Sequence, residues 1–289
     1  MIQSLQRGGR SRTYEAVGDP TGAMRPAVLV FHGSRQTGAV HREFTGGALD
    51  RLADEGRAVV AYLDGYRGNW NDARRGSRFP ARLEDVDDVG FVRAVIDRLH
   101  ETHGVDRRRV IVVGYSNGGQ MVLRLVHEVP ELLAGAVVVA TTMPVADDFT
   151  AGYSDAASTP VPVTIVAGTA DRISRYDGGR FAWWARALFK VDGTALSAEA
   201  TAAYFASRNG IRAAPVRSIV HPAAPRGRTT TTRTEYRDGE HPPVSLVTVA
   251  GGGHTVPAAK AAPAILGATG RDLTIDRIVE EMLDALPAR

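Results

Sequence analysis

One serine of this chain stands where a buried strand would turn into a helix. The stretch 109–128 reads RVIVVGYSNGGQMVLRLVHE, and Ser116 lies between an apolar run and a segment with helical spacing. Gly114, Ser116 and Gly118 match the pattern G-x-S-x-G, in which glycines permit a sharp turn that lifts the serine hydroxyl clear of the sheet. The helix N-terminus behind that hydroxyl offers backbone N–H groups to developing negative charge. The pattern predicts that Ser116 is a nucleophile.

A second stretch, Gly152-Tyr153-Ser154-Asp155-Ala156, is close to the same pattern but lacks the second glycine. It follows the polar sequence ADDFTA rather than an apolar run, so we interpret Ser154 as a loop residue. Ser116 could itself be only a small residue in a tight turn. A serine alone is a poor nucleophile, and its prediction therefore depends on finding a base and an acid that orients the base.

Two later apolar runs each end on one of the required groups. The run VPVTIVAGTAD delivers Asp171 just past its end, and VSLVTVAGGGH delivers His254. Both side chains are expected at the carboxyl ends of parallel strands, where ligands bind in open α/β sheets. Asp177 is the rival acid, and His41 could line the site. The order serine, acid, histidine predicts a Ser116–Asp171–His254 triad.

Hydrolysis through such a triad also needs two donors for the oxyanion. The residue after the nucleophile, Asn117, is expected to supply one backbone N–H. The loop after the apolar run AVLVFHG should supply the other, and we assign it to Ser34, with Arg35 as the adjacent alternative. His32 in the same loop is expected to stabilise the loop rather than to act as the base.

The elements that must position these groups alternate along the chain. Runs rich in Val and Ile predict strands that are buried on both faces, and three segments with three- and four-residue apolar spacing predict helices. The strands are expected at 27–33, 58–65, 109–116, 134–141, 161–171 and 244–254, and the helices at 86–104, 118–128 and 274–286. This alternation predicts one α/β domain over residues 1–289 with a mostly parallel sheet flanked by helices.

The region 175–243 breaks the alternation, and we expect it to be a lid or cap inserted before the last core strand. Its first part, RFAWWARALF, is expected to be helical, with Trp183 and Trp184 available to the substrate. Trp70, in the stretch NWND, could form the opposite wall of the site. The polar stretch RGRTTTTRTEYRDGE is expected to be mobile or folded over the surface.

The composition excludes several other classes of protein. The 289 residues are 44% hydrophobic with a formal net charge of +3, and the chain contains no cysteine, so thiolate nucleophiles and zinc–thiolate sites are impossible. No apolar run is long enough to span a membrane, and the arginine clusters form no recognisable nucleic-acid motif. We therefore expect a cytoplasmic protein that binds neither nucleic acid nor membrane, needs no cofactor or metal and acts on a small or oligomeric substrate. The sequence leaves its oligomeric state open.

Taken together, the motifs VFHGSRQTG, NWND, VDDVGFVRAVIDRL, GYSNGGQM, GTAD and GGGHT resemble those of polyhydroxybutyrate depolymerase-like esterases, a group similar to feruloyl and acetylxylan esterases. The resemblance covers about residues 12–175 and 244–286. It implies an α/β-hydrolase fold, the triad and oxyanion hole assigned above, no cofactor and a carboxylic ester substrate. The chain departs from the group at Val256 and Ala167, where relatives usually have an aromatic residue and a histidine, and it lacks their cysteines.

Three functions are compatible with these motifs. The first is a serine esterase that forms an acyl-enzyme. The same groups can also serve a cytoplasmic biosynthetic acyltransferase or thioesterase, and an α/β-hydrolase scaffold can be catalytically silent and act as a binding module. Intact catalytic residues favour the esterase.

Overall fold

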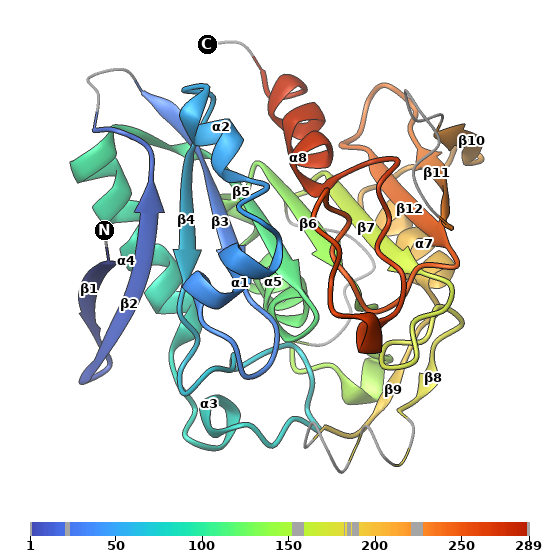
Figure 1. Cartoon of the computed structure of the whole chain (residues 1–289), viewed down its shortest axis with the longest axis horizontal. Helices are drawn as coiled ribbons and strands as arrows, with labels where there is room; N and C mark the ends of the chain where they lie inside the picture. Colours follow the sequence, from blue (N-terminus) through green and yellow to red (C-terminus); the bar gives the residue numbers. More distant parts are fainter. Residues whose placement is uncertain are drawn as a thin grey trace.

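A computed structural model of the protein describes residues 2–20, 24–151, 159–181, 183, 186, 191–220 and 228–287. Within these residues, one 10-stranded sheet runs through the whole molecule in the order β1-β2-β4-β3-β5-β6-β7-β12-β11-β10 (Figure 1). The strands of this sheet are β1 (Ile2–Arg7), β2 (Arg10–Val17), β3 (Arg25–Phe31), β4 (Val59–Leu63), β5 (Val105–Tyr115), β6 (Gly135–Val139), β7 (Val163–Gly168), β10 (Val216–Val220), β11 (Thr230–Tyr236) and β12 (Val244–Ala250).

The six strands that the sequence predicts are β3, β4, β5, β6, β7 and β12, and they form the parallel centre of the sheet. The outer strands β1, β2, β10 and β11 pair antiparallel on either side. Central strands are buried along almost their whole length, as the apolar runs require. The prediction of an α/β fold with a mostly parallel sheet is confirmed.

Helices cover both faces of this sheet (Figure 1). One face packs against α4 (Asp88–His103), α5 (Asn117–Glu128) and α7 (Ala198–Arg208), and the other against α2 (Asp50–Asp54) and α8 (Ile275–Asp284). The short helices α1 (Gly38–Phe44), α3 (Pro80–Leu83), η1 (Pro130–Leu132), η2 (Ala146–Asp148) and η3 (Ala264–Leu266) lie in the connections, and β8 (Gly179–Arg180) pairs with β9 (Thr194–Ala195). None of the described helices is long and apolar enough to cross a membrane.

Local signals account for the limits of the helices that the sequence predicts. Helix α4 follows Asp87, whose carboxylate accepts a hydrogen bond from Gly90 N–H, and it ends at His103, where the next residue, Gly104, has a left-handed φ of 65°. Helix α8 follows Thr274, as expected, although the threonine side chain makes no capping hydrogen bond.

Parts of the region 175–243 pack against the core of the domain. Helix α7 packs Ala202 and Phe205 into the core. Strand β11 pairs with β12 from Thr230 to Tyr236, so this part of the polar stretch extends the central sheet and is neither mobile nor merely folded over the surface, contrary to the expectation from the sequence. Consecutive threonines suit a strand because their branched side chains favour extended backbone, and an antiparallel strand near a sheet edge needs no continuous apolar run.

Candidate active site

The predicted nucleophile lies at a strained turn between β5 and α5. Ser116 has φ 53° and ψ −113°, a conformation that L residues rarely adopt. The glycines around it are required by close backbone contacts. A Cβ at Gly114 would lie 2.2 Å from Gly118 O, and a Cβ at Gly118 would lie 2.1 Å from Phe31 O. The pattern G-x-S-x-G therefore serves the tight packing of helix α5 against β3 and β5.

The structure brings the three predicted triad residues together. His254 Nε2 lies 3.0 Å from Ser116 Oγ, and His254 Nδ1 lies 2.7 Å from Asp171 Oδ2. Asp171 Oδ1 accepts hydrogen bonds from Ile173 N–H at 2.8 Å and Ser174 N–H at 2.9 Å. These donors hold the carboxylate toward the histidine. The histidine can then accept the serine proton at Nε2 while Nδ1–H donates to Asp171.

The alternatives for the acid and the base lie elsewhere. Asp177 is exposed, whereas Asp171 is buried and bonded to the histidine ring. His41 is buried between the rings of Phe44 and Tyr115, at centroid distances of 5.9 and 5.5 Å. Ser154, in the discarded pattern, lies outside the described residues.

Backbone hydrogen bonds separate the two alternatives for the second oxyanion donor. Arg35 N–H donates to Gly68 O at 2.8 Å and is already used by the loop. Among the described residues, no acceptor binds the N–H of Ser34, and Ser34 lines the same small cavity as Ser116 and His254. Asn117 is the first residue of α5, where backbone N–H groups have no partner inside the helix. Ser34 and Asn117 therefore remain the candidate donors.

Sequence reasoning missed the groups that hold the residue after the nucleophile. Asn117 Oδ1 accepts a hydrogen bond from Trp70 N–H at 2.9 Å, and Asn117 Nδ2 donates to Asp72 Oδ2 at 2.5 Å. Asp72 is fully buried and also bonds to the guanidinium of Arg74. The stretch NWND thus fixes the start of helix α5 by binding the side chain of Asn117. The sequence signal that could have revealed these groups was the polar stretch itself, which follows a core strand.

Trp70 is placed differently from the expected substrate wall. Its side chain is completely buried, and its indole N–H donates to His32 O at 3.0 Å. It packs against the rings of Phe31 and His32. Trp70 therefore supports the loop that carries Ser34 and does not face an open site, because a tryptophan in this position satisfies both its apolar surface and its N–H inside the protein.

The two other predicted substrate contacts lie in the first part of the 175–243 region. Trp183 is 76% exposed, while Trp184 lies outside the described residues. Nearby, Phe181 and Val191 do line the cavity beside Ser116, so this part of the region borders the site.

Tyr115 is a second residue whose role the sequence did not reveal. Its hydroxyl donates to His254 O at 2.8 Å, and its ring lies 5.2 Å from the His254 ring. A Cβ at Gly33 would lie 2.8 Å from the Tyr115 ring, which explains the glycine in the loop after β3. Tyr115 thereby holds the histidine loop against the nucleophile turn.

The cavity beside the serine is small. It encloses about 20 Å³, close to the space of one or two water molecules. Its described lining consists of Ser34, Arg74, Ser116, Ala140, Thr141, Ile173, Ser174, Phe181, Val191 and His254. No three His, Asp or Glu side chains gather into a metal site within the described part of the chain.

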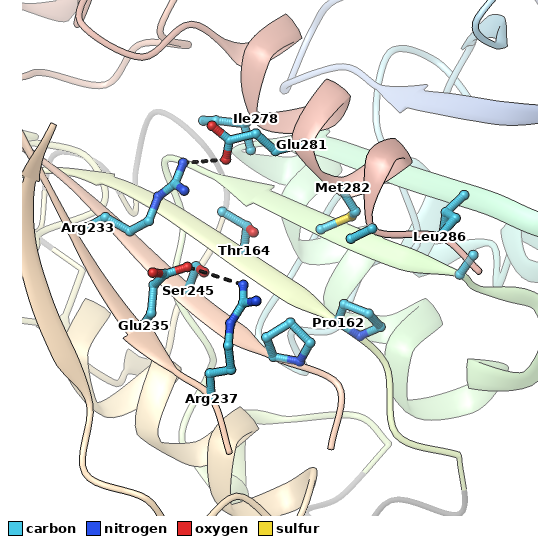
Figure 2. Close-up of a pocket in the computed structure, with 13 residues that line it drawn as sticks. Pro162, Thr164, Arg233, Glu235, Arg237, Ser245, Ile278, Glu281, Met282 and Leu286 are labelled. Atoms are coloured by element: carbon cyan, nitrogen blue, oxygen red, sulfur yellow. Dashed lines mark hydrogen bonds and ion pairs between the residues drawn. The ribbon is translucent and has the colours of Figure 1, made fainter. Parts of the chain in front are cut away.

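A separate cavity of about 140 Å³ lies between helix α8 and strands β7, β11 and β12 (Figure 2). Met282 of α8 and Leu286, just after this helix, border it, and Arg233 of β11 pairs with Glu281 across it. Thr164 near the start of β7 lies in its wall, whereas Asp171 follows the opposite end of the same strand. None of the predicted catalytic residues lines this cavity.

Two buried histidines predict that the fold loses stability in acid. Burial lowers the pKa of His32 to about 4 and that of His41 to about 3, below the usual 6.5. Below pH 6.5 these histidines are protonated in the unfolded chain but stay neutral in the folded protein. The free energy of unfolding that the protein has above pH 6.5 is therefore reduced as the pH falls toward 4. Each histidine contributes a slope of up to about 1.4 kcal/mol per pH unit in this window.

Urea unfolding between pH 7.5 and pH 4.5 measures this slope. Replacing His41 with Gln is expected to reduce it, while His241→Gln, at a half-buried position beside Asp238, is the comparison variant. An unchanged slope in His41→Gln would contradict the conclusion that the buried His41 makes the stability depend on pH.

Comparisons with known proteins identify the family of the chain. The chain matches the alpha/beta hydrolase family over residues 27–267. It is 33% identical over 289 residues to a protein of Nocardia uniformis subsp. tsuyamanensis named "Putative esterase NocK", with 95% of this chain and 80% of that protein covered. Over 122 residues it is 30% identical to Feruloyl esterase B of Piromyces equi, covering 42% of this chain and 22% of that protein.

The fold is similar to that of an acetyl xylan esterase from Aspergillus awamori, with a TM-score of 0.59 at 17% sequence identity, covering 90% of this chain and 96% of that structure. At such low identity the likeness concerns the fold alone. The family match extends over most of the chain and includes the strands and turns that carry the Ser–His–Asp geometry. The chain is therefore an esterase-like member of the alpha/beta hydrolase family.

Proposed function

We propose that the protein is a serine carboxylic ester hydrolase that works through the Ser116–His254–Asp171 triad. The observation that carries this proposal is the continuous line of hydrogen bonds from Ser116 Oγ through the imidazole to the Asp171 carboxylate, at 3.0 and 2.7 Å. A serine used only to complete a turn has no need of a buried histidine that is itself oriented by a buried acid.

In the proposed reaction, His254 Nε2 takes the proton of Ser116 as Oγ attacks the ester carbonyl carbon. The carbonyl oxygen becomes an oxyanion that the N–H groups of Asn117 and Ser34 stabilise. His254 then gives its proton to the departing alcohol, which leaves an acyl group on Ser116. Water, deprotonated by the same histidine, attacks this acyl-enzyme and releases the acid. Asp171 stabilises the imidazolium in both halves of the reaction.

The substrate class follows from the relatives and from the size of the cavity. Relatives named as esterases support an ester. A cavity of about 20 Å³ beside the nucleophile favours a short acyl group in this conformation of the protein. We propose a small or oligomeric ester rather than a polymer with long acyl chains. The proposed steps require no cofactor.

Within the inserted region, we propose that the described residues around Phe181 and Val191 cover the site. Phe181 and Val191 border the cavity, and the exposed Trp183 lies two residues beyond Phe181. An exposed indole contributes little to the core and remains available to a ligand. Replacing Trp183 with Ala should therefore shift the preferred acyl length without lowering the melting temperature.

A fluorophosphonate probe and a panel of 4-nitrophenyl esters of increasing acyl length test the proposed function. The probe should form an adduct that peptide mass spectrometry locates on Ser116, and acetyl or propionyl esters should be hydrolysed fastest. A protein that is folded but neither labelled nor active on any ester would be a binding module instead. A strong rate increase with added alcohols or thiols would indicate acyl transfer.

A further inference from the structure

The cavity beside the nucleophile has one permanently charged side chain in its described lining. Arg74 lines it together with Ser116 and His254, while the remaining described lining residues are uncharged. Arg74 is 8% exposed, so its guanidinium is largely withdrawn from water. A fixed positive charge on the wall of a small cavity requires an explanation, because water screens it poorly there.

The guanidinium is held by one edge only. Arg74 Nε lies 3.1 Å from Asp72 Oδ2, and Nη2 donates to the same oxygen. No described residue accepts a hydrogen bond from Nη1. A guanidinium has five N–H donors, and an arginine bound side-on through Nε and Nη2 keeps its Nη1–Nη2 edge for a second planar acceptor. Asp72 therefore orients Arg74 and leaves the other edge open.

Arg74 is not the only group that binds Asp72. Its carboxylate also accepts from Asn117 Nδ2 at 2.5 Å and from the backbone N–H of Arg74 at 2.9 Å. The guanidinium of Arg82 donates to the backbone oxygen of Asp72. The Asp72 carboxylate therefore contacts Arg74 and Asn117, while Arg82 binds only the backbone oxygen of Asp72.

The approach to the cavity is also rich in arginine. Val191 is shared with a neighbouring depression of about 400 Å³, whose described lining includes Arg78, Arg186 and Asp192. Asp192 is already paired with Arg180 at 3.1 Å and with Arg186 at 3.5 Å. The described lining of this depression thus holds two arginines and one acid, which favours the approach of an anion.

We infer that the ester hydrolysed at Ser116 carries a carboxylate, which binds end-on to Arg74 beside the scissile bond. This inference rests on the proposed esterase function. A carboxylate matches the planar pair of N–H donors that Asp72 leaves open, and the bidentate contact would place the ester relative to the serine. Arg74 is then a substrate-binding residue that selects anionic esters over neutral ones of the same size.

Two pairs of esters test this selection, because the carboxylate could lie on either side of the ester bond. On the alcohol side, 4-acetoxybenzoate is compared with its neutral methyl ester. On the acyl side, the mono-4-nitrophenyl ester of adipic acid is compared with 4-nitrophenyl hexanoate. In at least one pair the native protein should prefer the anionic ester in kcat/KM by about tenfold or more, as a charge-assisted pair of hydrogen bonds allows. The preference should fall as salt is added.

The readout for variants is the ratio of kcat/KM within a pair. Arg74→Gln should bring the ratio close to one, and Arg74→Lys, which keeps the charge but loses the planar edge, should retain part of it. Because Arg74→Gln leaves Asp72 without its cation, the double variant Asp72→Asn/Arg74→Gln repeats the measurement with both charges removed. Arg75→Gln is the matched control: it removes the same charge from the neighbouring residue, whose Nε binds Phe149 O.

The outcomes separate this inference from the proposed function. A native protein that hydrolyses neutral esters but prefers neither anionic ester overturns the role of Arg74 and leaves the esterase intact. So does an Arg74→Gln variant that slows both members of a pair equally, or an equal loss of preference in Arg75→Gln. Absence of any ester hydrolysis together with absence of fluorophosphonate labelling overturns the esterase itself.

Discussion

Replacing Ser116 with alanine is expected to lower kcat for ester hydrolysis by about 10⁴- to 10⁶-fold. The hydroxyl is the only described oxygen within hydrogen-bond distance of His254 Nε2, at 3.0 Å, so its removal leaves the histidine with no nucleophile to activate. Binding and the oxyanion donors would supply the residual rate. Alanine tolerates the backbone φ of 53° no worse than serine does, so the melting temperature should change little.

Initial rates with 4-nitrophenyl acetate, together with fluorophosphonate labelling and a thermal melt, measure these effects. Ser154→Ala is the control from the similar sequence pattern and should retain the native rate. If Ser154→Ala lost activity and Ser116→Ala kept it, the assignment of the nucleophile would be wrong.

The second large effect is expected at the acid. Asp171→Asn should lower kcat by about 10⁴-fold because it inverts the polarity of the contact with His254. The backbone N–H groups of Ile173 and Ser174 both donate to Asp171 Oδ1. An asparagine would place its carbonyl oxygen toward these donors and its NH₂ group toward His254 Nδ1. The histidine would then carry its proton on Nε2, where it cannot accept the proton of Ser116.

Asp177→Asn is the matched control, since it makes the same chemical change six residues further along at an exposed position. Its kcat should stay within about twofold of the native value, as for most surface substitutions. Comparison of kcat for the two variants on one ester decides between the carboxylates. A larger loss at Asp177 would overturn the assignment of Asp171.

The parallel centre of the sheet followed from the sequence because its signals are local. The apolar runs at 27–33 and 109–116 correspond to β3 and β5, and a strand covered on both faces can hardly have another composition. The strand β11 escaped the same reasoning. Neither face of this strand needs apolar side chains along its whole length. Its stability comes from backbone pairing with β12, which no local pattern within Thr230–Tyr236 predicts.

The candidate triad was also predictable, although Ser116 and His254 are 138 residues apart. Parallel strands bring their carboxyl ends to one edge of the sheet, so a serine, an acid and a histidine that each follow a core strand must lie close together. The topology thus converts three local positions into one site. The choice of Asp171 rather than Asp177 as the acid could be argued in the same way, because the range of positions that a residue can take grows with its distance from the end of the strand.

The sequence by itself therefore determined the fold class and the residues that gather at the sheet edge, since apolar periodicity and turn glycines act over a few residues. Only the tertiary structure decided which groups near that edge are already engaged. The use of Arg35 N–H by Gly68, the burial of Trp70 beneath His32 and the contact of Asp72 with Arg74 and Asn117 depend on which hydrogen-bond partners meet after folding. Buried polar groups must find such partners wherever the fold places them, and the spacing of residues along the chain does not specify that choice.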